Sequence, residues 1–133
     1  MQIEALAAAA REARRRAYCP YSRYAVGAAL LSADGEIFTG CNIENATQGP
    51  GICAERTALY KAVSEGVREF AAIAVAGGPA DGPEDPGCAP CGVCRQALAE
   101  FCRPDLVVIL AGPESCRVYT LGEIFPFAFR LEK

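Results

Sequence analysis

The sequence predicts an α/β fold, a three-layer α/β/α sandwich built around a mixed sheet. Two observations support this prediction. Segments with helical spacing alternate with short apolar runs, in the order helix, hairpin, helix, strand, helix, strand. The first apolar run, residues 25–31, is nearly continuous, which is typical of a strand buried on both faces and therefore of helices on both sides of a sheet. With 133 residues and no internal repeat or linker, residues 1–133 are expected to form a single domain.

The N-terminal part predicts a helix followed by a hairpin. Small apolar residues recur at helical spacing through residues 2–18, and Pro20 ends that helix. The run Arg14-Arg15-Arg16 is interpreted as its solvated face. Asp34-Gly35 is a strong signal for a two-residue hairpin turn, which joins the strand over 25–31 to a returning strand over 36–43.

The second half predicts helices that alternate with strands. After a loop at 46–52, a helix is expected to begin near Cys53 and to end at Gly66, which can adopt the left-handed cap conformation. A strand, a helix, a strand and a short last helix follow, at residues 71–76, 91–101, 106–110 and 120–126. Thr120 and Glu123 have capping-box spacing for that last helix.

Composition excludes several classes of protein. No apolar run reaches the roughly 18 residues that suggest a membrane span. The opening residues lack the layout of a secretion signal, so a cytoplasmic location is expected. A net charge of −3 argues against binding of long nucleic acids, which normally requires a basic surface. We therefore expect a small-molecule partner, no nucleic acid and no membrane.

The eight cysteines and the absence of histidine narrow the chemistry. Without a secretion signal, reduced thiols are expected, which favours metal binding or catalysis for the clustered cysteines. The lack of histidine removes serine–histidine triads, histidine metal ligands and an imidazole base. Proton transfer near neutral pH then requires a carboxylate, a thiol or a lysine.

Three cysteines and one glutamate have the spacing of a catalytic zinc site. Two residues separate Cys91 from Cys94, so one turn can present both sulfurs to one ion. Cys53 could supply a third sulfur, which would leave the fourth position of a tetrahedron open. Glu55 lies close enough in sequence to act on a water at that position. Such an open site activates water, whereas a closed site builds structure.

The predicted helix N-termini matter because three thiolates place excess negative charge on zinc. Cys53 and Cys91 both stand where a helix is expected to begin. Two helix N-termini would offset this charge and offer free N–H groups to the sulfurs. Arg56 is expected to contact the ligands rather than the metal, adding a full positive charge.

At this point the residues resemble a known family. Cys53-Ala54-Glu55 followed by Pro90-Cys91-x-x-Cys94 resembles the zinc deaminase signature in its three-cysteine version. Four further segments are similar to the small homotetrameric cytidine deaminases, at residues 17–22, 26–31, 40–45 and 53–66. The resemblance covers about residues 5–129. It implies a cytidine deaminase-like fold with a five-stranded sheet. It also implies Zn2+-dependent hydrolysis of cytidine and deoxycytidine to uridine and deoxyuridine, with release of ammonia.

The resemblance also implies residue roles. Cys53, Cys91 and Cys94 would hold the zinc, and Glu55 would transfer protons. The residues implied in substrate binding are Asn42 and Glu44 at the ribose hydroxyls, Tyr24 beside the base, Ala54, and Phe129 reaching into a neighbouring subunit's pocket. Gln96 falls where the family has an amide near the metal site. A homotetramer with active sites shared between subunits would follow.

Alternatives remain open at this stage. Within residues 46–51, Gln48 stands where the family has an aromatic, which keeps a deaminase of another cytosine-containing nucleoside in consideration. Cys88 could complete a closed four-cysteine site in a noncatalytic zinc-stabilised module, and a redox C-x-x-C protein is a weaker option. Without the family, Asn42 and Glu44 could equally be polar residues at a strand end, and Tyr24 and Phe129 would be core aromatics.

Overall fold

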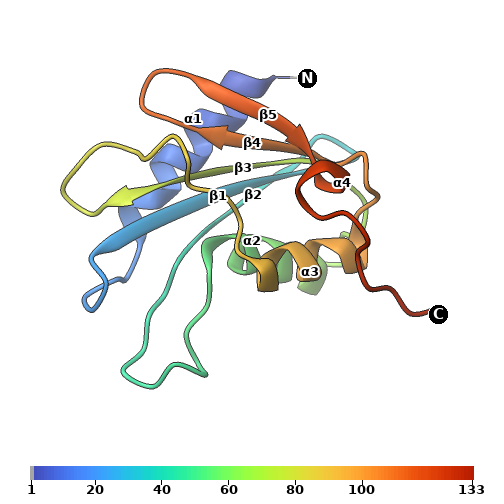
Figure 1. Cartoon of the computed structure of the whole chain (residues 1–133), viewed down its shortest axis with the longest axis horizontal. Helices are drawn as coiled ribbons and strands as arrows, with labels where there is room; N and C mark the ends of the chain where they lie inside the picture. The colour runs from blue at the N-terminus through green and yellow to red at the C-terminus, as the bar shows by residue number, and fades with distance from the viewer. Residues whose placement is uncertain (1) are drawn as a thin grey trace.

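A computed structural model, which describes residues 2–133, shows one five-stranded mixed sheet with the strand order β2-β1-β3-β4-β5 (Figure 1). The strands are β1 (Tyr24–Ser32), β2 (Ile37–Cys41), β3 (Phe70–Pro79), β4 (Val107–Ala111) and β5 (Cys116–Thr120). The β3–β4 pair is parallel, and every other neighbouring pair is antiparallel. The mixed sheet predicted from the sequence is therefore confirmed.

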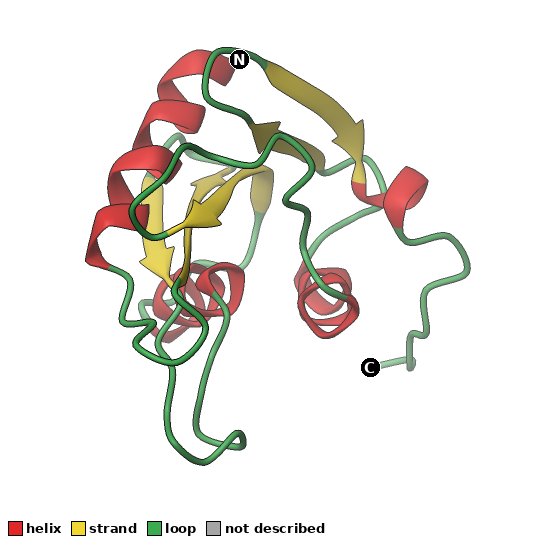
Figure 2. Ribbon diagram, turned by 60° about the vertical axis from the view of Figure 1, so that its left-hand side comes forward, coloured by secondary structure: helices red, strands yellow, loops and turns green. Residues whose placement is uncertain are grey.

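Helices cover both faces of this sheet (Figure 2). The helices are α1 (Ile3–Ala13), continued by the 3-10 helix η1 (Arg14–Arg16), then α2 (Ala54–Ser64), α3 (Gly92–Phe101) and α4 (Leu121–Ile124). Helix α1 packs on one face, and α2 and α3 pack on the other. This arrangement confirms the predicted three-layer fold.

The continuous apolar character of the central strands follows from this double coverage. In β1, Ala28 and Leu30 belong to the core beneath α2 and α3, whereas Ala29 belongs to the core beneath α1. In β3, Ile73 and Val75 face α2 and α3, while the alanines at 72, 74 and 76 face α1. Small residues on the α1 side and larger ones on the other side fill two unequal layers.

Two details of the sheet differ from the sequence prediction. The hairpin closes on Ser32 and Glu36, with a three-residue loop that ends at Gly35, whose φ is +93°. The fifth strand, β5, had no position in the sequence prediction. It is an edge strand whose middle residues Arg117 and Val118 are exposed, so it lacks the apolar run that identifies the buried strands.

The prediction for the arginine run was wrong in one respect. Arg15 and Arg16 are exposed, but Arg14 is 8% exposed and is one of three buried polar or charged residues in the described chain. Helix α1 ends at Ala13, and the tighter 3-10 turn that follows directs Arg14 onto the sheet.

Helix ends follow the expected chemistry. Gly66 has a φ of +93° and follows the last turn of α2, which confirms the predicted left-handed cap. Thr120 and Glu123 form the predicted capping box at α4. No helix of the described chain has the length and apolar character needed to cross a membrane.

Close contact between α2 and β2 generates a stability prediction. A methyl group at Gly40 would lie 2.5 Å from the amide nitrogen of Ala58 and 2.6 Å from the carbonyl oxygen of Ala54. Gly40→Ala is expected to lower the free energy of unfolding by about 1–3 kcal/mol, because the backbones must separate. Urea denaturation measures this change. Gly49→Ala is the control, since its methyl group would meet nothing within 4 Å. Equal midpoints for the two variants would contradict the prediction.

Candidate active site

The three candidate ligands come from the N-termini of two helices on the same face of the sheet. Cys53 is the N-cap of α2 and Cys91 the N-cap of α3, both with extended backbone, and Cys94 lies in the first turn of α3. Alanines 54, 58 and 62 form a stripe of small residues that packs α2 against the sheet, and all three are fully buried. The packing of α2 and α3 therefore sets where the sulfurs meet.

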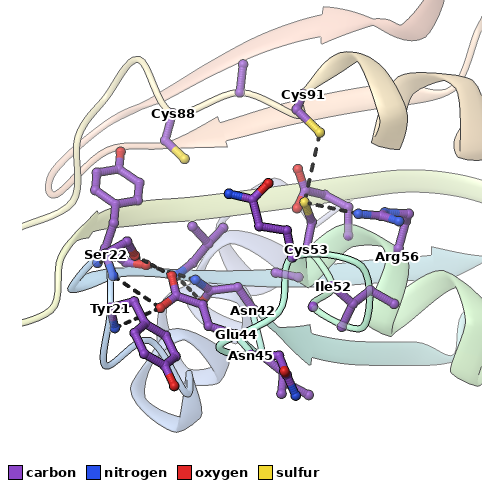
Figure 3. Close-up of a pocket in the computed structure, with 18 residues that line it drawn as sticks. Tyr21, Ser22, Asn42, Glu44, Asn45, Ile52, Cys53, Arg56, Cys88 and Cys91 are labelled. Carbon is purple, nitrogen blue, oxygen red and sulfur yellow. Dashed lines mark hydrogen bonds between the residues drawn. The ribbon is translucent and has the colours of Figure 1, made fainter.

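The sulfurs of Cys53, Cys91 and Cys94 all lie within 4.8 Å of one another. The Sγ atoms of Cys53 and Cys91 are 3.9 Å apart (Figure 3). Within the described residues this cluster holds three donors and does not include Cys88. Three thiols at this spacing, with no histidine or oxygen ligand among them, suit a soft or borderline cation such as zinc and leave one tetrahedral position to a non-protein ligand.

Charge at the cluster is balanced by its surroundings. Nη2 of Arg56 donates a hydrogen bond to Sγ of Cys53 at 3.5 Å (Figure 3). Hydrogen bonds from the Cys94 thiol and from Arg56 hold the pKa of Cys53 below its usual range. The pKa of Cys94 is raised, chiefly by the same bond to Cys53 and also by burial. The contact predicted for Arg56 is therefore present.

Glu55 is buried beside this cluster. It is 4% exposed, and burial is the main reason that its pKa rises to about 7. The negative charge on Cys53 acts in the same direction, and Arg56 opposes it. A carboxyl group with a pKa near neutrality can both accept and donate a proton, which is the property required of a general acid–base residue.

A cavity of about 630 Å³ opens in front of Cys53, Glu55 and Cys91. This volume is within the range of small-molecule sites. Tyr24, Asn42, Glu44 and Ala54 line it, as do Tyr21, Ser22, Gln48 and Cys88. The structure thus brings most of the predicted site residues to one cavity.

Comparison with known proteins identifies the family. A family model described as "Cytidine and deoxycytidylate deaminase zinc-binding region" matches residues 1–110 of this chain. A cytidine deaminase of Sporosarcina psychrophila is 47% identical, over 99% of this chain and 94% of that protein. The chain belongs to the cytidine and deoxycytidylate deaminase family. A cytidine deaminase of Halalkalibacterium halodurans is 49% identical over 91% of this chain and 89% of that protein.

Solved structures agree with this family assignment. The crystal structure of a cytidine deaminase from Burkholderia pseudomallei superposes with a TM-score of 0.86 and 49% identity, over 97% of this chain and all of that chain. The resemblance, the fold, the enzyme class and the zinc cofactor expected from the sequence are therefore confirmed. The noncatalytic zinc module and the redox protein are not supported.

In this family member, Asn42 connects the cavity wall to β1. Its Oδ1 accepts a hydrogen bond from the Val26 amide at 2.9 Å, and its Nδ2 donates to the Tyr24 carbonyl at 2.8 Å. The side chain thus continues the β1–β2 pairing beyond Cys41, where β2 ends. One lone pair and one N–H of the amide remain for other partners.

Glu44 is held by the turn that precedes β1. Its Oε1 accepts hydrogen bonds from the amides of Tyr21 at 3.0 Å and Ser22 at 3.1 Å, and its Oε2 accepts one from the Ser22 hydroxyl (Figure 3). The Ser22 hydroxyl is the main cause of the lowered pKa of Glu44. Sequence reasoning missed Ser22, although the segment 17–22 was recognised as similar to the family. Nothing in the residue type alone pairs this serine with Glu44.

Tyr24 and Gln48 lie on the cavity wall at two different elements. The Tyr24 hydroxyl is 3.5 Å from Oδ2 of Asp85, and burial together with Cys88 and Asp85 raises its pKa. Gln48 belongs to the loop that follows β2. Ile43 and Ile52 close the neck of that loop through two backbone hydrogen bonds of 3.0 Å, and Cys53 follows directly.

Among the described residues, three predicted site residues do not line this cavity: Phe129, Gln96 and Cys94, which is buried. Phe129 is 66% exposed and does not line it. Gln96, on α3, donates a hydrogen bond from Nε2 to the Phe129 carbonyl at 2.9 Å. The Gln96 amide therefore fixes the C-terminal segment against the helix that carries Cys94. The roles expected for Phe129 and Gln96 stay predictions.

The contact of Arg56 with Cys53 generates a prediction about metal binding. Arg56→Ala is expected to weaken zinc binding by about tenfold or more, because it removes a charge-assisted hydrogen bond to a ligand sulfur. Competition with a chromophoric chelator measures the dissociation constant. Arg68→Ala removes the same charge from an exposed position and is the control. Equal zinc affinity and equal turnover in the two variants would exclude this role.

Proposed function

We propose that the protein catalyses the hydrolytic deamination of cytidine and deoxycytidine to uridine and deoxyuridine, with release of ammonia. One observation carries the proposal: three sulfurs lie within 4.8 Å of one another, and two of them, together with a buried glutamate, line a cavity of about 630 Å³. Family membership supports the same reaction. A nucleoside is small enough for such a cavity.

Zinc bound by Cys53, Cys91 and Cys94 would act as a Lewis acid that lowers the pKa of a coordinated water. The reaction forms a C–O bond at the ring carbon that carries the amine and breaks the C–N bond there. Glu55 would take one proton from the attacking water and deliver it to the ring nitrogen, and would then take the remaining proton of the added hydroxyl and deliver it to the departing amine. The buried position of Glu55 supports this role, since its carboxyl exchanges a proton near neutral pH.

Asn42 and Glu44 would bind the sugar. The Glu44 carboxylate already accepts three hydrogen bonds from Tyr21 and Ser22, which leaves capacity for about one more. Its lowered pKa keeps it an acceptor for a hydroxyl. Asn42 has one donor and one acceptor site left after its bonds to β1. Together the two side chains can bind neighbouring hydroxyls.

Tyr24 and Ala54 would contact the base. Both line the cavity, and Ala54 lies between the ligand Cys53 and the acid–base residue Glu55. The bond between the Tyr24 hydroxyl and Asp85 holds the ring at the wall. A flat aromatic ring and a small methyl group leave room for a planar base.

The assembly that we propose is a homotetramer with shared active sites. Phe129 is exposed and the Gln96 amide anchors its backbone, so the ring can enter the cavity of a neighbouring subunit. Other large apolar side chains are exposed as well, among them Tyr18, Tyr21, Tyr60 and Phe127. A cytoplasmic location is also proposed, and the free state of all eight cysteines agrees with it.

A direct assay tests the function. Purified, zinc-loaded protein is expected to convert cytidine to uridine, followed by the change in ultraviolet absorbance and by ammonia release. A zinc chelator is expected to abolish turnover, and added zinc to restore it. Deoxycytidine and other cytosine-containing nucleosides form the comparison panel, because Gln48 lines the cavity. Zinc-loaded protein that turns over another nucleoside but not cytidine would overturn the proposal.

Substitution of the acid–base residue gives a second test. Glu55→Gln keeps the size of the side chain but cannot transfer a proton, so turnover is expected to fall by about 10³-fold or more. Zinc content, measured by atomic absorption, is expected to stay at the level of the unaltered protein. Glu65→Gln, an exposed glutamate at the end of the same helix, is the matched control. Turnover retained in Glu55→Gln would remove Glu55 from the mechanism.

A further inference from the structure

Arg14 is a buried arginine whose contacts the catalytic chemistry does not use. It is the first residue of η1, and its side chain is 9% exposed. Among the described residues, Arg14 is not one of those that line the cavity. A buried charge is costly unless its hydrogen bonds are satisfied. The hydrogen-bond partners of Arg14 therefore indicate which segments of the chain it holds together.

The guanidinium group of Arg14 makes four hydrogen bonds. Nε donates to the Ala25 carbonyl of β1 at 2.9 Å, and Nη1 donates to Oε2 of Glu84 at 2.9 Å. Nη2 donates to the carbonyls of Pro79 at 2.5 Å and Gly82 at 3.1 Å. One planar group thus joins the N-terminal helix, β1, the end of β3 and the segment that follows β3. A lysine has no fork that reproduces these directions.

The segment that Arg14 holds leads to the metal ligands. Residues 80–90 connect the end of β3 to Cys91. Glu84 is 16% exposed, so its ion pair with Arg14 is largely shielded from solvent. The segment also folds back over β3, where a methyl group on Gly78 would lie 2.4 Å from the Pro83 carbonyl and 3.0 Å from Nη2 of Arg14.

Backbone hydrogen bonds connect the part of the segment that Arg14 holds to the cavity wall. The Asp85 amide donates to the Gly77 carbonyl at 2.6 Å, and the Cys88 amide donates to the Asp85 carbonyl at 3.1 Å. Cys88 and Ala89 then form part of the cavity wall. Cys91 follows as an exposed residue, whereas Cys94 is buried within α3. Among the three ligands, Cys91 therefore depends most on the segment before it.

We propose that the Arg14–Glu84 pair is a positioning device for the metal centre. It fixes residues 80–90 so that the Cys91 sulfur stays near the sulfurs of Cys53 and Cys94. The inference rests on the proposed function in one respect, the role of Cys91 as a metal ligand. Ligands that are held in place before binding lose less conformational entropy when the ion arrives, so the pair raises metal affinity without touching the metal.

The test compares two buried substitutions with two exposed ones of the same chemistry. Glu84→Gln removes the charge from the buried pair, and Arg14→Lys keeps the charge but loses the fork. Glu12→Gln and Arg15→Lys are the matched controls, because that ion pair is 3.6 Å long and its side chains are 58% and 79% exposed. Circular dichroism and the urea midpoint first establish that each variant is folded. Should Arg14→Lys fail to fold, Glu84→Gln completes the test.

Two measurements follow on the full chain. Co²⁺ affinity, determined by competition and by the thiolate-to-cobalt absorption, is expected to fall by about tenfold in both buried variants and to stay unchanged in the controls. Amide hydrogen exchange of the zinc-loaded protein is expected to accelerate by about tenfold or more in residues 80–91, but not in α2. Together these two results support the proposal.

Either of two outcomes overturns the inference. One is a Co²⁺ affinity in folded Glu84→Gln within about twofold of Glu12→Gln, below the usual effect of ligand-supporting contacts. The other is unchanged exchange in residues 80–91. Unaltered protein that binds Co²⁺ but does not deaminate cytidine would refute the proposed function and leave this test intact. Unaltered protein that binds no Co²⁺ would refute both.

Discussion

The structure depends on compensation of negative charge at three converging sulfurs. The three thiolates of Cys53, Cys91 and Cys94 would bring three negative charges to an ion that carries two positive ones. The chain has no histidine that could replace one of them as a neutral ligand. The positive ends of α2 and α3 and the hydrogen bond from Arg56 oppose this excess. Without them, a coordinated water would be less acidic, because anionic ligands donate charge to the metal. The helices are therefore part of the chemistry as well as of the scaffold.

The arrangement of the sheet brings the N-termini of α2 and α3 together. β1 and β3 are buried on both faces, so α1 can cover one side while α2 and α3 share the other (Figure 2). Gly40 and the alanines of α2 allow a close approach between that helix and β2. The same face then carries Glu55 on α2, buried next to the sulfurs. Close packing thus sets both the ligand geometry and the pKa of the acid–base residue.

Much of this arrangement was predictable from the sequence, because it depends on local patterns. Helix ends at Gly66 and Thr120 follow from residue types with strong capping preferences. Buried strands follow from apolar runs. The ligand set follows from cysteine spacing together with the order of motifs along the chain. The helix-end and strand signals lie within a few residues of the feature that they predict, whereas the ligand set also depends on Cys53, which is 38 residues from Cys91.

What the sequence did not predict depends on contacts between distant segments. The burial of Arg14 requires carbonyl groups of β1 and of the segment after β3, which no local pattern connects to an arginine run. Ser22 pairs with Glu44 only because the chain before β1 returns to the end of β2. Strand β5 is exposed at the sheet edge and has no apolar signature. Such features appear only in three dimensions.

The loop between β2 and α2 has a consequence for how this enzyme can evolve. Two backbone hydrogen bonds between Ile43 and Ile52 close it at its neck, and Cys53 begins the next element directly beyond. Asn45, Gln48 and Gly51 of this loop line the cavity, whereas Cys53 lies on the helix side of these two bonds. Sequence changes in the loop therefore alter the cavity wall at residues other than the three candidate ligands.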